Sequence, residues 1–153
     1  QVKPHLRPDS VVRVVGYDGF SLTKPDYIWR EELSQWLQRG ASVRYLLQKP
    51  LAETPDAARE VRRLAGPSGN LTLRQMDEDG ASGLAPQWST FHFVVVDNPN
   101  LLWVEECHPH HDTVAQRCYF FDHTRTGSVP AYSVLRAQFD RVFDSESSAL
   151  LSV

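Results

Sequence analysis

Cysteine is scarce in this chain of 153 residues, which contains only Cys107 and Cys118. Two cysteines are too few for the disulfide framework of a small secreted domain, so we expect two reduced thiols, with a single bridge between them as the alternative. Long apolar runs are also missing, because none approaches the roughly 20 residues that a membrane-spanning helix requires. Since the N-terminus lacks the apolar core of a signal peptide, we expect a cytoplasmic protein.

The chain also lacks a large excess of positive or negative charge. Lysine and arginine number 16 against 19 aspartates and glutamates, which gives a net charge of −3. Proteins held on nucleic acid by bulk charge are strongly basic, so the case for nucleic acid is weak. On the second predicted helix and its neighbours, a solvated helix face is the favoured interpretation and a local basic face is the alternative. The arginines concerned are Arg59, Arg62, Arg63, Arg39, Arg44 and Arg74.

The composition is that of an ordinary globular domain, with 41% hydrophobic and 23% charged residues. A chain of this length buries enough surface for one core, and we expect one domain at 11–146, preceded by an arm at 1–10 and followed by a tail at 147–153. Strands are predicted at 11–17, 43–48, 71–76, 91–96 and 101–105, with a short extra strand at 118–121. Helices are predicted at 25–39, at 54–65 and around 135–143. This order predicts an α/β fold with a mixed sheet flanked by helices.

The first predicted helix has clear start and stop signals. Pro25 suits a first helical turn, and Gly40 suits the position just beyond a helix end. Between them, apolar residues recur at helical spacing and form one face, at Trp29, Leu33, Trp36 and Leu37.

Three segments carry a resemblance to a known family: GASVRYLL, TFHFVVVDNPNLLWVEE and AQFDRVFDSES. With the order of elements around them, they resemble one half of a phospholipase D-like fold. Active members of that superfamily carry His-x-Lys-x-x-x-x-Asp followed by Gly-Ser-x-Asn. The resemblance implies a histidine that attacks phosphorus, a lysine that neutralises the phosphoryl oxygens, and a second histidine from another half or subunit that protonates the leaving group. It also implies pairing of this single half, as a homodimer or with another domain of a longer chain.

The motif is broken in this sequence. Placing Asp97 on the motif aspartate puts Thr90 at the nucleophile and His92 at the lysine, and the same register puts Glu105 at the motif serine. Threonine is a weak nucleophile without a base beside it, and a glutamate repels phosphate. The alternative register, with His92 as the nucleophile, replaces the motif aspartate with Pro99 and fits less well.

We therefore expect a domain that is not an enzyme and acts as a binding or assembly module, paired across the vestigial active-site face. The alternative is a divergent phosphodiesterase or nuclease that uses His92 and Glu105, with or without a metal ion. A third hypothesis is a sensor that reads a small anionic ligand in the former phosphate pocket.

His92 is the most informative single residue. Alternation along its strand places it on the same face as Val94 and Val96, where a lone histidine is more often a hydrogen-bonded structural residue than a catalyst. Glu105 and Glu106 are expected nearby on the neighbouring strand, and carboxylates there would raise the pKa of the imidazole and make it a poor nucleophile.

A second group of chemically competent residues follows the fifth strand. Cysteine and histidine are zinc ligands, but adjacent side chains seldom converge on one tetrahedron, so a metal would need a distant ligand such as Cys118 or His123. We favour an exposed histidine-rich loop and expect no cofactor, because no phosphate-binding glycine motif is present. The residues of this group are Cys107, His108, His110 and His111.

Overall fold

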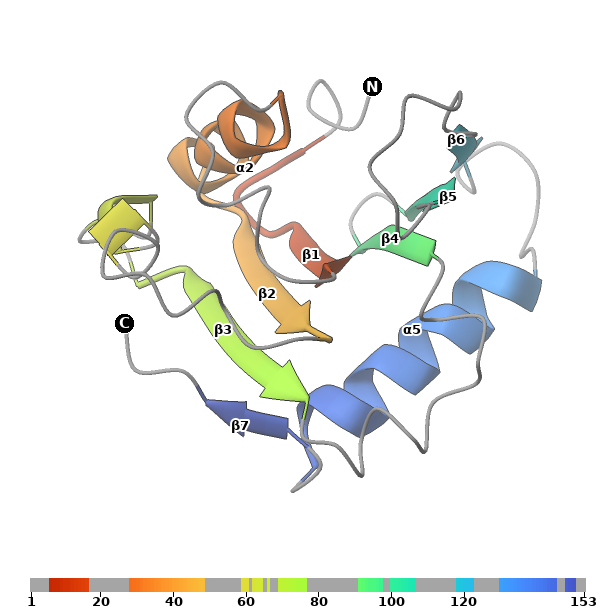
Figure 1. Ribbon diagram of the computed structural model, residues 1–153. Helices are drawn as coiled ribbons and strands as arrows, with labels where there is room; N and C mark the ends of the chain where they lie inside the picture. Colours follow the sequence, from red (N-terminus) through yellow and green to blue (C-terminus); the bar gives the residue numbers. More distant parts are fainter. Residues whose placement is uncertain are drawn as a thin grey trace.

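The computed structural model describes residues 6–16, 28–48, 59–60, 62–64, 66, 69–76, 91–97, 100–106, 118–122, 130–145 and 148–150. Within these residues, seven strands form one sheet in the order β6-β5-β4-β1-β2-β3-β7 (Figure 1). The strands are β1 (Val11–Gly16), β2 (Ser42–Leu47), β3 (Leu71–Met76), β4 (Phe91–Asp97), β5 (Leu101–Glu106), β6 (Cys118–Asp122) and β7 (Ser148–Leu150).

The sheet is mixed. β1, β2 and β3 run parallel to one another, whereas β4 pairs antiparallel with β1 and continues into the antiparallel strands β5 and β6. Parallel neighbours need a crossover connection, and α2 (Ile28–Gln38) lies between β1 and β2 in the sequence. Helical residues at 59–60 and 62–64 lie between β2 and β3. The expected α/β fold class is confirmed.

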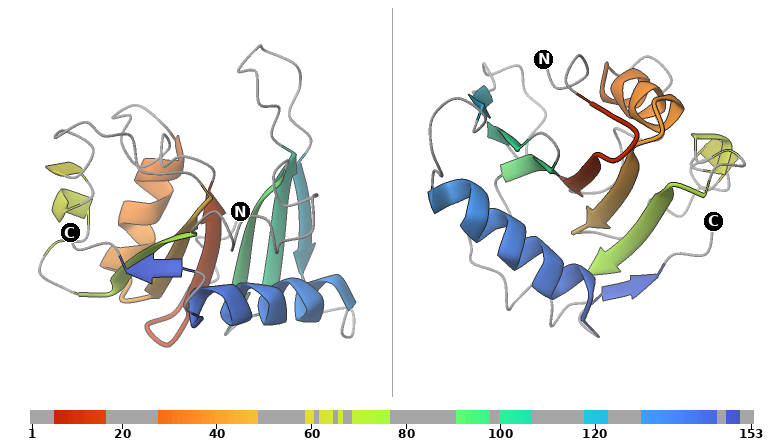
Figure 2. Two further views of the ribbon diagram at one scale, coloured as in Figure 1. Left: turned by 60° about the horizontal axis from the view of Figure 1, so that its bottom comes forward. Right: turned by 180° about the vertical axis from the view of Figure 1, so that it is seen from behind.

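Helices cover both faces of the sheet. α2 lies on one face, and α5 (Pro130–Phe143) lies across the other (Figure 2). Alternate residues of each strand therefore enter different cores: Val14 packs on the α2 side, whereas its neighbour Val15 packs on the α5 side. The α2 core contains Leu33, Trp36, Leu37, Val43, Tyr45, Leu47, Val94 and Val96, and the α5 core contains Leu46, Phe93, Val95, Leu102, Phe139 and Phe143.

α2 ends as the sequence predicts. Gly40 has a φ of 85°, its N–H donates to the Leu37 carbonyl at 3.0 Å, and the N–H of Ala41 donates to the Trp36 carbonyl at 3.2 Å. These two bonds are the paired closure of a Schellman motif, which satisfies carbonyls that a helix end otherwise leaves open. The chain then enters β2, where Ser42 donates to the Ser10 carbonyl at 3.0 Å.

The structure departs from the expected pattern near the two ends of the chain. Ser148–Leu150 lies in the segment expected as a tail, but it forms β7 and pairs antiparallel with β3. In the segment expected as an arm, Leu6 is buried in the α2 core. The predicted start of the first helix at Pro25 and the first turn of the helix predicted at 54–65 lie outside the described residues. Among the helices described, none combines the length and the apolar character of a bilayer span.

The helix end at Gly40 generates the first prediction. An alanine in this left-handed conformation carries a steric cost, so Gly40→Ala should lower the free energy of unfolding by about 1–2 kcal/mol in urea denaturation. Gln38→Ala, on the exposed side of the same turn, is the control and should change it by less than about 0.5 kcal/mol. Equal stability of the two variants would contradict the role of Gly40.

Candidate functional site

Asp97, which the sequence analysis placed on the motif aspartate, ends β4, and both of its carboxylate oxygens have partners. Its Oδ2 accepts from Nη1 of Arg13 at 2.8 Å and lies 3.3 Å from Nη2 of Arg136. Its Oδ1 is hydrogen-bonded to the hydroxyl of Tyr132, which also donates to the Val96 carbonyl at 3.1 Å. Since Tyr132 and Arg136 belong to α5, this carboxylate joins β1, β4 and α5.

Arg13 is a buried charge on the central strand. Its Nε donates to Oδ1 of Asp140 at 2.7 Å, so the guanidinium lies between two carboxylates from different elements. Burial lowers the pKa of Arg13, but the hydrogen bonds and charges of Asp140 and Asp97 outweigh burial and raise the pKa above its usual range. A buried cation without these partners would carry a large desolvation cost.

Two further arginines connect the sheet to the end of α5. Nη1 of Arg44 lies 3.7 Å from Oδ1 of Asp140, and Nη2 of Arg74 donates to the Ser145 carbonyl at 3.3 Å. Both guanidinium groups also lie over the ring of Phe143, at 5.7 and 5.6 Å from its centroid. Such distances are typical of cation–π contacts, so β2 and β3 bind the same helix that β1 and β4 bind.

The six arginines considered for a basic face therefore do not share one surface. Arg44 and Arg74 contact α5, whereas Arg59, Arg62 and Arg63 belong to the helical residues beside α2 on the other face (Figure 1). Alternation explains the division, because residues of a strand that contact α5 cannot also join the opposite face.

Tyr132 has a perturbed ionisation. Burial raises the pKa of its hydroxyl well above the usual 10.0, and the hydrogen bond to Asp97 and the negative charge of that carboxylate raise it further. The hydroxyl is therefore a hydrogen-bond donor throughout the physiological range and is unsuited to act as a base or nucleophile there.

His92 lies near the opposite end of β4. It follows Phe91 at the start of the strand, and the register of β4 and β5 places it directly across from Glu105, as the sequence predicts. His92 and Asp97 are five positions apart, and an odd difference puts two strand positions on opposite faces. Val94 and Val96 accordingly pack on the α2 side, whereas Phe93 and Val95 pack on the α5 side where Asp97 contacts its partners.

The remaining sequence candidates lie elsewhere. Among the described residues, no group of three or more histidine, cysteine, aspartate or glutamate side chains could hold a metal ion. The candidates outside the described residues are Thr90, Cys107, His108, His110 and His111.

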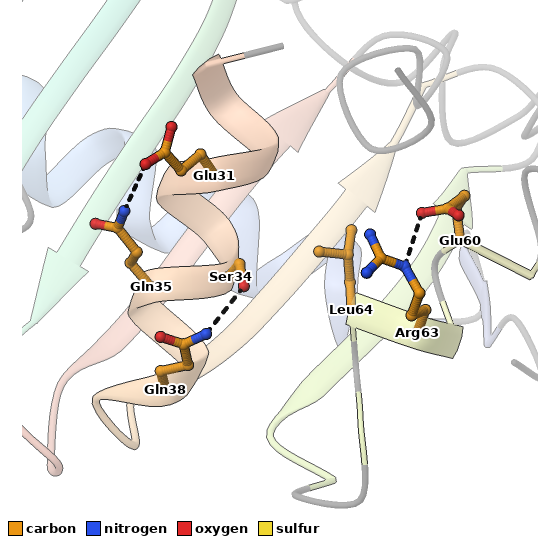
Figure 3. Close-up of a pocket in the computed structure, with 7 residues that line it drawn as sticks. All are labelled: Glu31, Ser34, Gln35, Gln38, Glu60, Arg63 and Leu64. Carbon is orange, nitrogen blue, oxygen red and sulfur yellow. Dashed lines mark hydrogen bonds and ion pairs between the residues drawn. The ribbon is translucent and has the colours of Figure 1, made fainter. Parts of the chain in front are cut away.

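A polar pocket of about 590 Å³ lies between α2 and the helical residues at 59–64 (Figure 3). Hydrogen bonds run along each of its walls: Gln35 donates to Glu31 at 3.0 Å, and Arg63 donates to Glu60 at 3.2 Å. Of the residues considered in the sequence analysis, Arg63 of the candidate basic face is among those that line it. Its lining residues are Glu31, Ser34, Gln35, Gln38, Glu60, Arg63 and Leu64.

Sequence reasoning missed Arg13, Tyr132 and Asp140. A signal was present for Arg13, because it is the charged residue inside the otherwise apolar VVRVV of β1. A charge in such a strand is stable only with buried partners. No comparable signal marks Tyr132 or Asp140, whose roles depend on how α5 crosses the sheet.

Comparison with known proteins supports the fold. The chain is similar to the crystal structure of Nuc, a phospholipase D family member from Salmonella typhimurium, with a TM-score of 0.56 and 16% sequence identity. The similarity covers 97% of this chain and 86% of that chain. No family model matches the sequence, and neither does any curated protein. The chain thus has a phospholipase D-like α/β fold of one half.

The charge network generates the second prediction. Asp97→Ala removes a partner of the buried Arg13 guanidinium and should lower the free energy of unfolding by about 3–5 kcal/mol. Glu60→Ala breaks a more exposed pair with Arg63 and should cost less than about 1 kcal/mol. Urea denaturation measures both, and equal losses would show that Asp97 is not a structural anchor.

The third prediction concerns alkaline pH. Because the folded-state pKa of Tyr132 is raised above 10.0, its contribution to stability is complete below that pH and is lost as pH rises through the folded pKa. Urea denaturation between about pH 9 and pH 11 should show a steeper loss of stability for the wild type than for Tyr132→Phe. Parallel pH profiles would refute the assignment.

Proposed function

We propose that this chain is a non-catalytic phospholipase D-like domain that acts as a binding or assembly module, paired across its vestigial active-site face. The main support for the proposal is the carboxylate of Asp97, which forms ion pairs with Arg13 and Arg136 and a hydrogen bond with Tyr132. That set of contacts accounts for the retention of an aspartate in a motif that has lost its nucleophile and its lysine. Its role is to fix α5 on the sheet rather than to assist phosphoryl transfer.

Phosphoryl transfer also needs positive charge around the phosphoryl oxygens. In the described part of the chain, three arginines of the sheet contact Asp140 or the Ser145 carbonyl on the α5 face: Arg13, Arg44 and Arg74. The strand position on the α2 face that would hold the motif lysine holds His92, and its cross-strand partner is Glu105. A carboxylate at that position opposes the binding of a phosphodiester.

The pairing rests on the resemblance to a superfamily in which two halves meet at the motif-bearing face. One half of that fold is present here, so a second copy or another domain would complete it. In this proposal, the second copy or the other domain completes a surface for binding. It does not complete a catalytic site.

One observation favours the alternative of a divergent hydrolase. The register of β4 and β5 brings an imidazole and a carboxylate position together, and such a pair can serve as a base that activates water. This alternative predicts hydrolysis that depends on both His92 and Glu105.

The fourth prediction separates the two functions. Purified protein should hydrolyse bis(4-nitrophenyl) phosphate no faster than buffer, with or without added Mg²⁺, Mn²⁺ or Zn²⁺, and His92→Ala should not differ from it. Sedimentation analysis of the same sample should give twice the monomer mass. Hydrolysis that disappears in both His92→Ala and Glu105→Gln would overturn the proposal, and a monomer without activity would remove its pairing component.

A further inference from the structure

The three parallel strands each place an arginine on the α5 face of the sheet. Arg13 on β1 is the register partner of Arg44 on β2, and Arg74 on β3 is the register partner of Leu46, two residues beyond Arg44. Because alternate residues of a strand share a face, the three arginines form a row across the sheet. The carboxyl end of α5 lies against this row (Figure 1).

The end of α5 carries negative charge, although a helix of this polarity favours positive charge there. Asp140 lies in the last turn of α5 and Asp144 directly follows the helix. Like charges four residues apart also repel one another, and Arg141, the basic residue of this turn, is exposed. The two aspartates are therefore stabilised by the arginines of the sheet and not by the helix itself.

The ionic compensation is weaker for Arg44 than for Arg13. Arg13 is buried and lies 2.7 and 2.8 Å from carboxylate oxygens, whereas Nη1 of Arg44 lies 3.7 Å from Asp140 and 3.9 Å from Asp144. Both distances to Arg44 are longer than a hydrogen bond. The side chain of Arg44 is 39% exposed and that of Asp144 is 64% exposed, so Asp144 is free to turn toward the solvent while Asp140 stays on Arg13.

Positive charge exceeds negative charge in this connected group, which has four arginines and three aspartates. Arg74 contributes to the excess, because its hydrogen bond to the end of α5 is accepted by the neutral carbonyl of Ser145. Both Arg44 and Arg74 also lie over the ring of Phe143, and diagonal positions on neighbouring strands, about 8 Å apart, are within reach of long side chains. The group consists of Arg13, Arg44, Arg74, Arg136, Asp97, Asp140 and Asp144.

We propose that Arg44 and Arg74 form a binding site for a phosphate group with two negative charges, and that the Asp144 carboxylate occupies this site when phosphate is absent. Two guanidinium groups match the geometry and the charge of such an anion. The bound phosphate takes the place of Asp144 beside Arg44, so α5 stays on the sheet in both states.

This site goes beyond the proposed function and does not depend on it. Arg44 and Arg74 contact α5, whereas the strand position that corresponds to the motif lysine lies on the α2 face. The proposed site is therefore separate from the vestigial active-site face, and phosphate bound there is a ligand and not a substrate.

The fifth prediction concerns the titration of ¹⁵N-labelled protein with inorganic phosphate at about pH 8, where this ion is mostly a dianion. Sodium chloride keeps the ionic strength constant, because surface charge interactions are screened by salt. The backbone amide signals of Arg44, Arg74 and Asp144 should shift with saturation, and those of Arg62, which is exposed beside α2, should not.

Three variants test the roles of the charges. Asp144→Asn removes the competing carboxylate and should bind phosphate about threefold to tenfold more tightly than the wild type, which a merely structural role of Asp144 does not predict. Arg44→Gln should bind about tenfold more weakly, because a hydrogen bond to a charged group is lost. Arg62→Gln removes an arginine from the opposite face and is the matched control, with wild-type affinity.

Equal affinity of Asp144→Asn and the wild type, or unchanged binding by Arg44→Gln, would overturn the site. Dimethyl phosphate carries one charge and should bind more weakly than inorganic phosphate, and equal binding would contradict a site for a dianion. Glycerol 2-phosphate distinguishes the sources: tighter binding than inorganic phosphate supports a phosphate monoester as the ligand, and weaker binding supports the free ion. Failure of this site is distinguishable from failure of the proposed function, because only phosphodiester hydrolysis refutes the latter.

Discussion

The guanidinium of Arg13, buried between Asp97 and Asp140, is the interaction on which the arrangement of this domain depends. A cation on the central strand requires anionic partners in fixed positions, and these come from the end of β4 and from α5. Apolar packing of Phe139 and Val142 attracts α5 to the sheet without direction. The ion pairs fix the position of α5, because a different position would take Asp140 away from the buried charge of Arg13.

The same network separates two residues of β4 that the sequence analysis considered for chemistry. Asp97 contacts α5 on one face of the sheet, while His92 occupies a position of the α2 face. Their odd spacing along one strand enforces this separation. The contacts of Asp97 with Arg13 and Tyr132 give this aspartate a structural role, because they hold α5 on the sheet.

Much of the fold was predictable from local patterns. The apolar runs of β1 and β4 and the stop at Gly40 follow from side-chain periodicity and backbone conformation, which act over a few residues. β7 was missed because three residues in a serine-rich segment have no strand signal of their own and are fixed by pairing with β3. The proximity of His92 and Glu105 on neighbouring strands was predictable from the hairpin, whereas the contact of Arg13 with Asp140 depends on how α5 crosses the sheet and was not.

The order of the strands has a consequence for biosynthesis. The central strand β1 is made first, but Asp97 and Asp140 follow Arg13 by 84 and 127 residues. During translation the nascent chain therefore holds an apolar strand whose charge stays hydrated until nearly the whole domain has emerged. Contacts so distant in sequence slow folding and leave strand edges open to aggregation until they form.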